Sequence, residues 1–291
     1  MRSIALLGLV LGVLAVSAAV SPLVASMTTA LGFHFTFRRL FDRVFELWLV
    51  TALVLAWRPL DLGGAAAIGL SAPQRARDLA RGAAIGLAGI AVGLMLCWAW
   101  GALVPGLRFP PGKTVGKAAL GALGALAIGV GEEALFRGVL LRRLSLDLGR
   151  IGGVVVTTVI YATLHALRTG GGRSGAGSWA GVERLVTLLA PLTDVSALPS
   201  VIGLAGLGLV LAIARIATGS LWTSIGIHAS WVLVFRVGRL LFELRRWPVW
   251  LVGPGWPPLV GGAAGWVAVA ATGVLLAAAL GRRSYATPDR R

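Results

Sequence analysis

The sequence predicts an all-α membrane protein, a polytopic transmembrane bundle of about eight spanning helices. Hydrophobic residues make up 57% of the 291 positions and charged residues only 13%, whereas a soluble domain carries about 25% charged residues. The apolar residues form long runs at 3–25, 82–104 and 259–280, each near the roughly 20 residues that span a hydrocarbon core. Arginines lie at the ends of such runs, where they can reach lipid headgroups. We therefore expect an integral, multi-pass protein of the cell membrane.

Apolar periodicity and turn residues divide the chain into spans and connections. The first run exceeds the 7–15 apolar residues of a typical signal peptide, so we interpret it as a retained anchor. Residues 63–70 are too short to span and are expected to form a loop or a re-entrant piece. The expected spans are 4–26, 44–57, 82–104, 118–141, 151–168, 199–217, 220–240 and 259–280. We expect N-terminal membrane helices and a connection at 1–80, a core at 81–245, and an interfacial loop, last helix and basic tail at 246–291.

The composition also limits the partners of the chain. The net charge of +16 does not predict nucleic-acid binding, because no basic face with interleaved aromatics stands apart from the membrane segments. Membrane lipid is the expected partner of the flanking arginines and of Trp247, Trp250 and Trp256, since indole rings favour the interface. Cys97 lies alone in an apolar run, which predicts a small buried hydrophobic residue.

Two adjacent carboxylates lie inside an apolar run, where a charged side chain is expensive. Glu132 precedes Arg142 by ten residues, or about 15 Å of helix, which places it near the middle of a bilayer. A carboxylate at that depth costs about 2.5–3.5 kcal/mol, so both must find partners. Glu133 can pair with Arg137 one turn later. Glu132 points about 100° away from Glu133 and needs a partner from another helix.

Two of the three histidines lie in neighbouring predicted spans and supply that partner. His165 follows Tyr161 by four residues on one helix face, and His228 lies within the span 220–240. His165 lies about 22 Å along its helix from Arg150, whereas Glu132 lies about 15 Å along its own helix from Arg142. The expected depths of the two side chains therefore differ by about 7 Å. Helix tilt can absorb such an offset, so we expect a Glu–His–His site inside the membrane. We assign no role to His34, which lies in a connection.

A carboxylate beside an imidazole can hold and deprotonate a water molecule. A second imidazole can stabilise the oxyanion that forms when water attacks an amide. The chain contains no HExxH pair, GxSxG elbow or P-loop, which would indicate other chemistries. Glu132, His165 and His228 could also bind zinc; we leave the metal open and favour a site without one.

Three motifs in this region resemble those of a known family. Residues 132–137 (Glu-Glu-Ala-Leu-Phe-Arg) resemble the EExxxR motif of the CAAX prenyl protease 2/Abi (CPBP) intramembrane peptidases. Residues 161–165 resemble the second motif, FxxxH, with Tyr161 in place of Phe. His228 resembles the first residue of the third motif, HxxxN. The motifs occur in the family's order, and the resemblance covers about residues 80–245.

The resemblance implies an all-helical membrane core that cuts peptides near prenylated or otherwise hydrophobic C-termini, or processes bacteriocin-like peptides. It also implies that Glu132 activates water with His165. In the same way, Glu133 and Arg137 would shape the site, and His228 would help to stabilise the oxyanion.

The third motif is incomplete, and this leaves alternatives open. Val232 occupies the position of the family's Asn, and the chain contains no asparagine. Ser224, one turn before His228, is the best-placed substitute donor. A catalytically impaired member that binds peptides or acts as a scaffold is therefore the first alternative. The second is a proton-coupled transporter, because intramembrane Glu, Arg and His residues also form proton relays.

Overall fold

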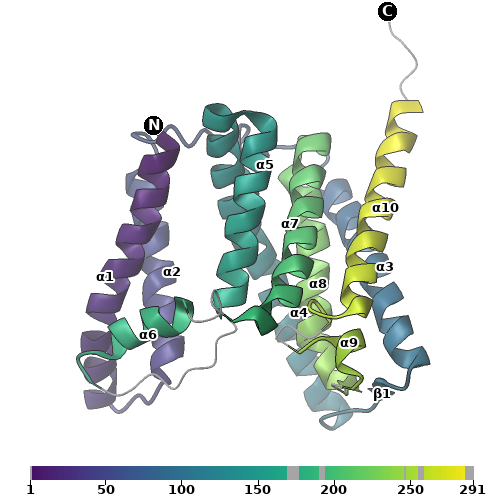
Figure 1. The fold of residues 1–291 in the computed structure, drawn as a ribbon, viewed down its shortest axis with the longest axis horizontal. Helices are drawn as coiled ribbons and strands as arrows, with labels where there is room; N and C mark the ends of the chain where they lie inside the picture. Colours follow the sequence, from purple (N-terminus) through teal and green to yellow (C-terminus); the bar gives the residue numbers. More distant parts are fainter. Residues whose placement is uncertain (1, 169–176, 190–193, 246, 255–258, 286–291) are drawn as a thin grey trace, which may run out of the picture. The chain divides into compact units, whose positions relative to one another are not determined.

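The computed structural model describes residues 2–168, 177–189, 194–245, 247–254 and 259–285. Helices make up nearly all of its regular structure (Figure 1), which confirms the predicted all-α class. Within the described residues, six helical stretches are long and apolar enough to cross a membrane. They are Arg2–Ala30, Arg75–Ala99, Pro111–His165, Val195–Thr218, Leu221–Leu241 and Ala263–Gly281. The predicted count of eight spans is not confirmed.

Two features of the chain explain the lower count. The predicted spans 118–141 and 151–168 are both helical and lie on either side of a bend at Gly149, but the stretch Pro111–His165 that contains them is counted once. The predicted span 44–57 falls in α2 (Phe37–Leu55), which is not among the six. Its first ten residues include five charged side chains, at positions 38, 39, 42, 43 and 46, and charges disfavour burial in hydrocarbon.

The chain forms two compact units, of which the first comprises Met1–Gly63 and Ala166–Val195. It holds α1 (Arg2–Ala30), α2 and a short helix α6 (Ala180–Leu189). We did not predict α6, because ten residues without a long apolar run give no spanning signal. A Cβ atom on Gly181 would lie 1.8 Å from the Ala18 carbonyl oxygen, so only glycine lets α6 approach α1 this closely.

The second unit comprises Gly64–His165 and Ser196–Arg291. It contains the helices and strands given next in chain order. They are α3 (Arg75–Ala99), β1 (Leu103–Pro105), α4 (Pro111–Glu133), the π-helix η1 (Ala134–Leu140), α5 (Leu141–Arg168), the 3-10 helix η3 (Val195–Ala197), α7 (Leu198–Thr218), α8 (Leu221–Leu241), β2 (Phe242–Leu244), α9 (Val249–Val252) and α10 (Ala263–Tyr285). The last residues of α5 and the first residue of η3 are the exceptions, and they fall in the first unit. Residues 63–70 contain turns but no helix, as expected for a loop. Strands β1 and β2 pair antiparallel.

Helix α8 packs against both α3 and α4 through glycines. A Cβ atom on Gly82 of α3 would lie 2.1 Å from the Thr223 carbonyl oxygen, and one on Gly129 of α4 would lie 3.0 Å from Ala229 Cβ. Small residues let membrane helices approach backbone to backbone. This close packing holds α8 beside the helix that carries Glu132.

The long helical stretch folds back on itself at Gly149. This residue has a φ of 74° and a ψ of 169°, so α5 consists of two helices joined at a sharp bend. A Cβ atom on Gly153 would lie 2.7 Å from the Ser145 backbone nitrogen, which shows that the two arms lie against each other. The expected offset of about 7 Å between Glu132 and His165 along the helix axes was wrong. It assumed that the first helix ends at Arg142, whereas the first arm continues to the bend at Gly149.

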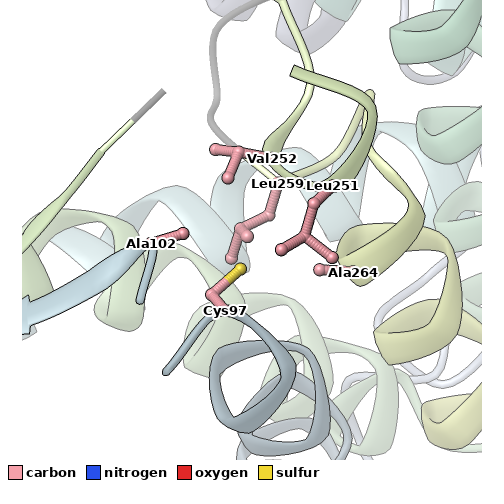
Figure 2. Packing of buried hydrophobic residues seen from close by; sticks show 6 residues of the cluster. All are labelled: Cys97, Ala102, Leu251, Val252, Leu259 and Ala264. Carbon is pink, nitrogen blue, oxygen red and sulfur yellow. The ribbon is translucent and has the colours of Figure 1, made fainter. Parts of the chain in front are cut away.

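A hydrophobic cluster lies within the second unit (Figure 2). Its buried members are Cys97, Ala102, Leu251, Val252, Leu259 and Ala264. Cys97 is free and buried, which confirms its prediction as a small core residue. Leu94, Phe235 and Leu244 pack against this cluster from α3, α8 and β2.

Candidate active site

Glu132 and His165 meet directly across the helical hairpin. Glu132 Oε2 lies 2.9 Å from His165 Nε2, a hydrogen-bonding distance. Glu132 is the penultimate residue of α4 and His165 lies near the end of α5. Glu132 precedes Gly149 by 17 residues and His165 follows it by 16. Two helical arms of nearly equal length therefore bring the two side chains to the same level.

The second nitrogen of His165 determines where its protons lie. His165 Nδ1 is 2.9 Å from the carbonyl oxygen of Tyr161, one turn earlier on α5. A carbonyl oxygen can only accept a hydrogen bond, so Nδ1 carries a proton. In a neutral imidazole Nε2 is then a lone-pair nitrogen, and its contact with Glu132 requires one further proton. Which partner of the Glu132–His165 contact donates therefore depends on where that proton lies.

His228 approaches the same carboxylate from α8. Its Nε2 lies 3.8 Å from Glu132 Oε2, and its Nδ1 lies 2.9 Å from Glu133 Oε1. The Nδ1–H group of His228 donates to the Glu133 carboxylate, which leaves Nε2 facing Glu132. Both imidazoles therefore present Nε2 to one oxygen atom, each with Nδ1 held by a neighbour.

Glu133 and Arg137 form the predicted ion pair, in a fully buried position. Arg137 Nη1 donates to Glu133 Oε1 at 2.7 Å, and both side chains have 0% exposure. Arg137 Nη2 donates to the carbonyl oxygen of Gly208 on α7 at 3.2 Å. Arg137 lies in the π-helix η1, a local widening of a helix that is common at functional sites. The pair links the π-helix to α7 and holds His228 through Glu133.

Solvent access separates the five predicted site residues into two groups. The side chains of Glu132 and His165 are 19% and 17% exposed, whereas His228 is 4% exposed. Glu133 and Arg137 are closed off entirely. Glu132 and His165 are therefore partly open at the surface, while the other three residues are enclosed within the bundle.

The structure adds two residues to the site: Tyr161, which the sequence analysis named only as a motif residue, and Gly208, which it did not name. The Tyr161 ring lies 4.3 Å from the Arg137 guanidinium carbon and 4.0 Å, centroid to centroid, from the His165 ring. Its spacing before His165 was a usable signal. Gly208 contributes a backbone oxygen, which no sequence pattern reveals. Ser224, the expected substitute donor, is buried and donates its hydroxyl to the Leu221 carbonyl oxygen at 2.9 Å.

Glu132, His165 and His228 also form a set that fits a metal ion. One ligand atom from each lies within 4.8 Å of the others. Two imidazoles, one carboxylate and an open position are a common catalytic zinc donor set. The Nδ1 contacts to Tyr161 and Glu133 are the type of support that metal-binding histidines use. Binding of an ion would require the direct Glu132–His165 hydrogen bond to open.

Comparison with known proteins agrees with the motifs. Residues 114–234 match the family model described as "Type II CAAX prenyl endopeptidase Rce1-like". This segment contains all five predicted site residues, and the match confirms the resemblance drawn from the three motifs. No curated protein and no solved structure matches the chain. The matched family is a protease family, and the six apolar helices fit a multi-pass membrane protein.

Proposed function

We propose that this chain is an intramembrane endopeptidase of the cell membrane that hydrolyses a peptide bond in a prenylated or otherwise hydrophobic peptide. The observation that carries the proposal is the Glu132 carboxylate, which faces the Nε2 atoms of His165 and His228 at 2.9 and 3.8 Å. The family match over residues 114–234 supports the same reaction class. The predicted core at 81–245, which we propose as the catalytic region, encloses that segment.

The reaction begins with a water molecule at the exposed pair. The water hydrogen-bonds to Glu132 and His165, and the Glu132 carboxylate accepts its proton as its oxygen attacks the peptide carbonyl carbon. The π bond of the carbonyl breaks and its electron pair moves to the oxygen. The product of this step is a tetrahedral oxyanion, with the former water proton on Glu132.

His228 is placed to stabilise that oxyanion. Its Nδ1–H group donates to Glu133, so a protonated His228 can donate from Nε2 to the developing negative charge. The buried Glu133–Arg137 pair orients this imidazole. When the tetrahedral species collapses, the carbon–nitrogen bond breaks and Glu132 returns the proton to the leaving amine. The net change is the addition of one water molecule across the peptide bond.

A bound zinc ion would be held by Glu132, His165 and His228, and it would supply Lewis-acid activation of the water. The steps assigned above to the side chains need only the groups of this chain. We therefore favour the reaction without a metal, and a chelation experiment tests this choice.

A second candidate function is peptide binding without turnover. Val232, partly buried on α8, offers no hydrogen bond where the family's third motif has Asn. Removal of one oxyanion donor typically lowers the rate about 10²–10³-fold. A chain with this deficit could hold a hydrophobic peptide and release it intact.

The decisive experiment compares two glutamine variants on one substrate. Purified full-length protein in detergent is incubated with an internally quenched farnesylated peptide, and cleavage is followed by fluorescence and mass spectrometry. Glu132→Gln should lower kcat about 10²–10⁴-fold, because it removes the general base. Glu46→Gln, at a partly exposed side chain of α2 in the first unit, should retain full activity.

Cleavage by Glu132→Gln at the rate of the unchanged protein would overturn the proposal. Tight binding of the farnesylated peptide with no cleavage by the unchanged protein would favour the second candidate. The same peptide without its farnesyl group identifies the substrate class, because a prenyl-specific enzyme should cleave it more slowly.

A further inference from the structure

A pocket of about 570 Å³ lies in the second unit, away from the Glu132–His165 pair. Its walls come from α3, the last turns of α8, the two strands and the loop after β1. Leu94, Phe235 and Leu259 contribute apolar surface. Leu259 also belongs to the cluster of Figure 2, and Leu94 and Phe235 pack against it. Arg108, Arg239 and Glu243 also line it. The size falls within the roughly 300–1,000 Å³ of small-molecule sites.

The pocket is separate from the candidate active site. On α8, Arg239 follows His228 by 11 residues, about 16 Å along the helix. His228 lies in the first half of α8, whereas the pocket residues lie in its last two turns. A ligand in this pocket therefore sits nearer the other end of the bundle.

Several features indicate that this end meets a membrane interface. The apolar helices α3 and α8, which contribute Leu94, Phe235 and Arg239 to the pocket, end at Ala99 and Leu241. The pocket residue Arg108 lies three residues before the start of α4 at Pro111. Trp100 and Trp250 are 60% and 56% exposed and make an edge-to-face contact at 5.2 Å. Exposed indole rings favour the headgroup level. Trp250 and the similarly exposed Trp247 are two of the three predicted anchors; Trp256 lies outside the described residues.

The charge around the pocket is strongly positive. The ranges 103–117 and 234–245 contain six cationic side chains and one acid, Glu243. The cations are Arg108, Lys113, Lys117, Arg236, Arg239 and Arg245. Among the described residues, neither Arg108 nor Arg239 forms an ion pair, so both guanidinium groups are available to an anion. Clustered basic residues at a membrane surface attract anionic lipids.

We propose that this pocket binds one anionic phospholipid. Its phosphate lies between Arg108 and Arg239, and an acyl chain extends over Leu94 and Phe235. An amphiphile of this kind matches both the apolar residues and the two arginines of the pocket lining. The lipid site is independent of peptide hydrolysis, so it stands even if the proposed reaction fails.

Native mass spectrometry of the full-length protein tests this inference. Delipidated protein is titrated with phosphatidylglycerol and, separately, with phosphatidylcholine of identical acyl chains. We expect a preference for phosphatidylglycerol, and the double variant Arg108→Gln/Arg239→Gln should lower its affinity on the order of tenfold, because each arginine near the surface contributes to binding. Arg236→Gln is the matched control, since this exposed arginine lies on α8 outside the pocket lining.

A second variant separates the pocket from general surface charge. Val234→Trp places bulk in the pocket lining and leaves every cation in place, so it should also reduce phosphatidylglycerol binding. The melting temperature of each variant without lipid verifies its fold. Unchanged binding by the folded double variant, or by folded Val234→Trp, would overturn the proposal. Equal loss in Arg236→Gln would also overturn it, because the attraction would then be diffuse.

Discussion

Glu132 and His165 are 33 residues apart in the sequence, yet Glu132 Oε2 and His165 Nε2 lie 2.9 Å apart. The contact depends on the bend at Gly149, which stands almost midway between them. The backbone conformation of Gly149 therefore determines whether Glu132, the proposed base, has His165 as its partner.

We predict that Gly149→Ala damages the candidate site without steric conflict. The combination of φ 74° and ψ 169° is essentially restricted to glycine and costs other residues about 1–3 kcal/mol. No atom lies within 4 Å of a Cβ atom built there, so only backbone strain opposes the change. The loss of peptidase activity should exceed what the lower folding stability explains, because a shifted hairpin misaligns His165 with Glu132.

The control for this variant is Gly116→Ala on α4, which also has open space around its Cβ position. Gly116 lies in a regular helix and lacks a positive φ, so alanine should keep both activity and melting temperature. Full activity in Gly149→Ala would contradict the assigned role of the bend.

Arg137→Gln should strongly destabilise the protein. The change leaves the Glu133 carboxylate, which is fully buried, without its cation, and breaking a buried ion pair typically costs about 3–5 kcal/mol. Chemical denaturation in detergent micelles measures this loss. The exposed Arg43–Glu46 pair on α2 provides the comparison, since Arg43→Gln should cost less than about 1 kcal/mol.

The double variant Glu133→Gln/Arg137→Gln sharpens this prediction. Its destabilisation should be smaller than the sum of the two single changes, because it leaves no unpaired charge at the buried site. Additive losses would show that the two side chains stabilise the protein separately.

Val232→Asn should raise kcat on the farnesylated peptide. Val232 lies one turn after His228 on α8, about 40° away around the helix, so an amide there can point toward the same site. Because the loss of one oxyanion donor typically lowers kcat about 10²–10³-fold, its restoration can raise kcat by a similar factor. Leu233→Asn, which points about 100° away from position 232, should bring no gain. An unchanged rate in folded Val232→Asn would indicate that another group already stabilises the oxyanion.

Removal of divalent metal should leave peptide cleavage largely intact. In the proposed mechanism the Glu132–His165 pair binds and deprotonates water by itself. Activity is measured before and after dialysis against a strong chelator, with the zinc content determined by elemental analysis. Loss of activity that added zinc restores, together with one zinc per chain, would identify Glu132, His165 and His228 as metal ligands.

The sequence by itself determined the fold class and singled out the candidate site residues. Long apolar runs need no tertiary information to predict membrane helices, because crossing hydrocarbon depends on local composition and length. Glu132, Glu133, Arg137, His165 and His228 stood out for a similar reason, since polar side chains inside such runs are expensive. The Glu133–Arg137 pair also followed from spacing on one helix.

Only the tertiary structure decided which partners the remaining side chains take and how the spans divide. The bend at Gly149 divides the two expected spans and aligns Glu132 with His165, whereas the flanking arginines suggested helix ends at other positions. The contact of His228 with Glu133, and that of Arg137 with Gly208, join residues 95 and 71 positions apart. Such contacts depend on how helices rotate and pack against one another. That packing is determined by glycine contacts such as Gly82 with Thr223, and a single sequence does not specify which helices meet.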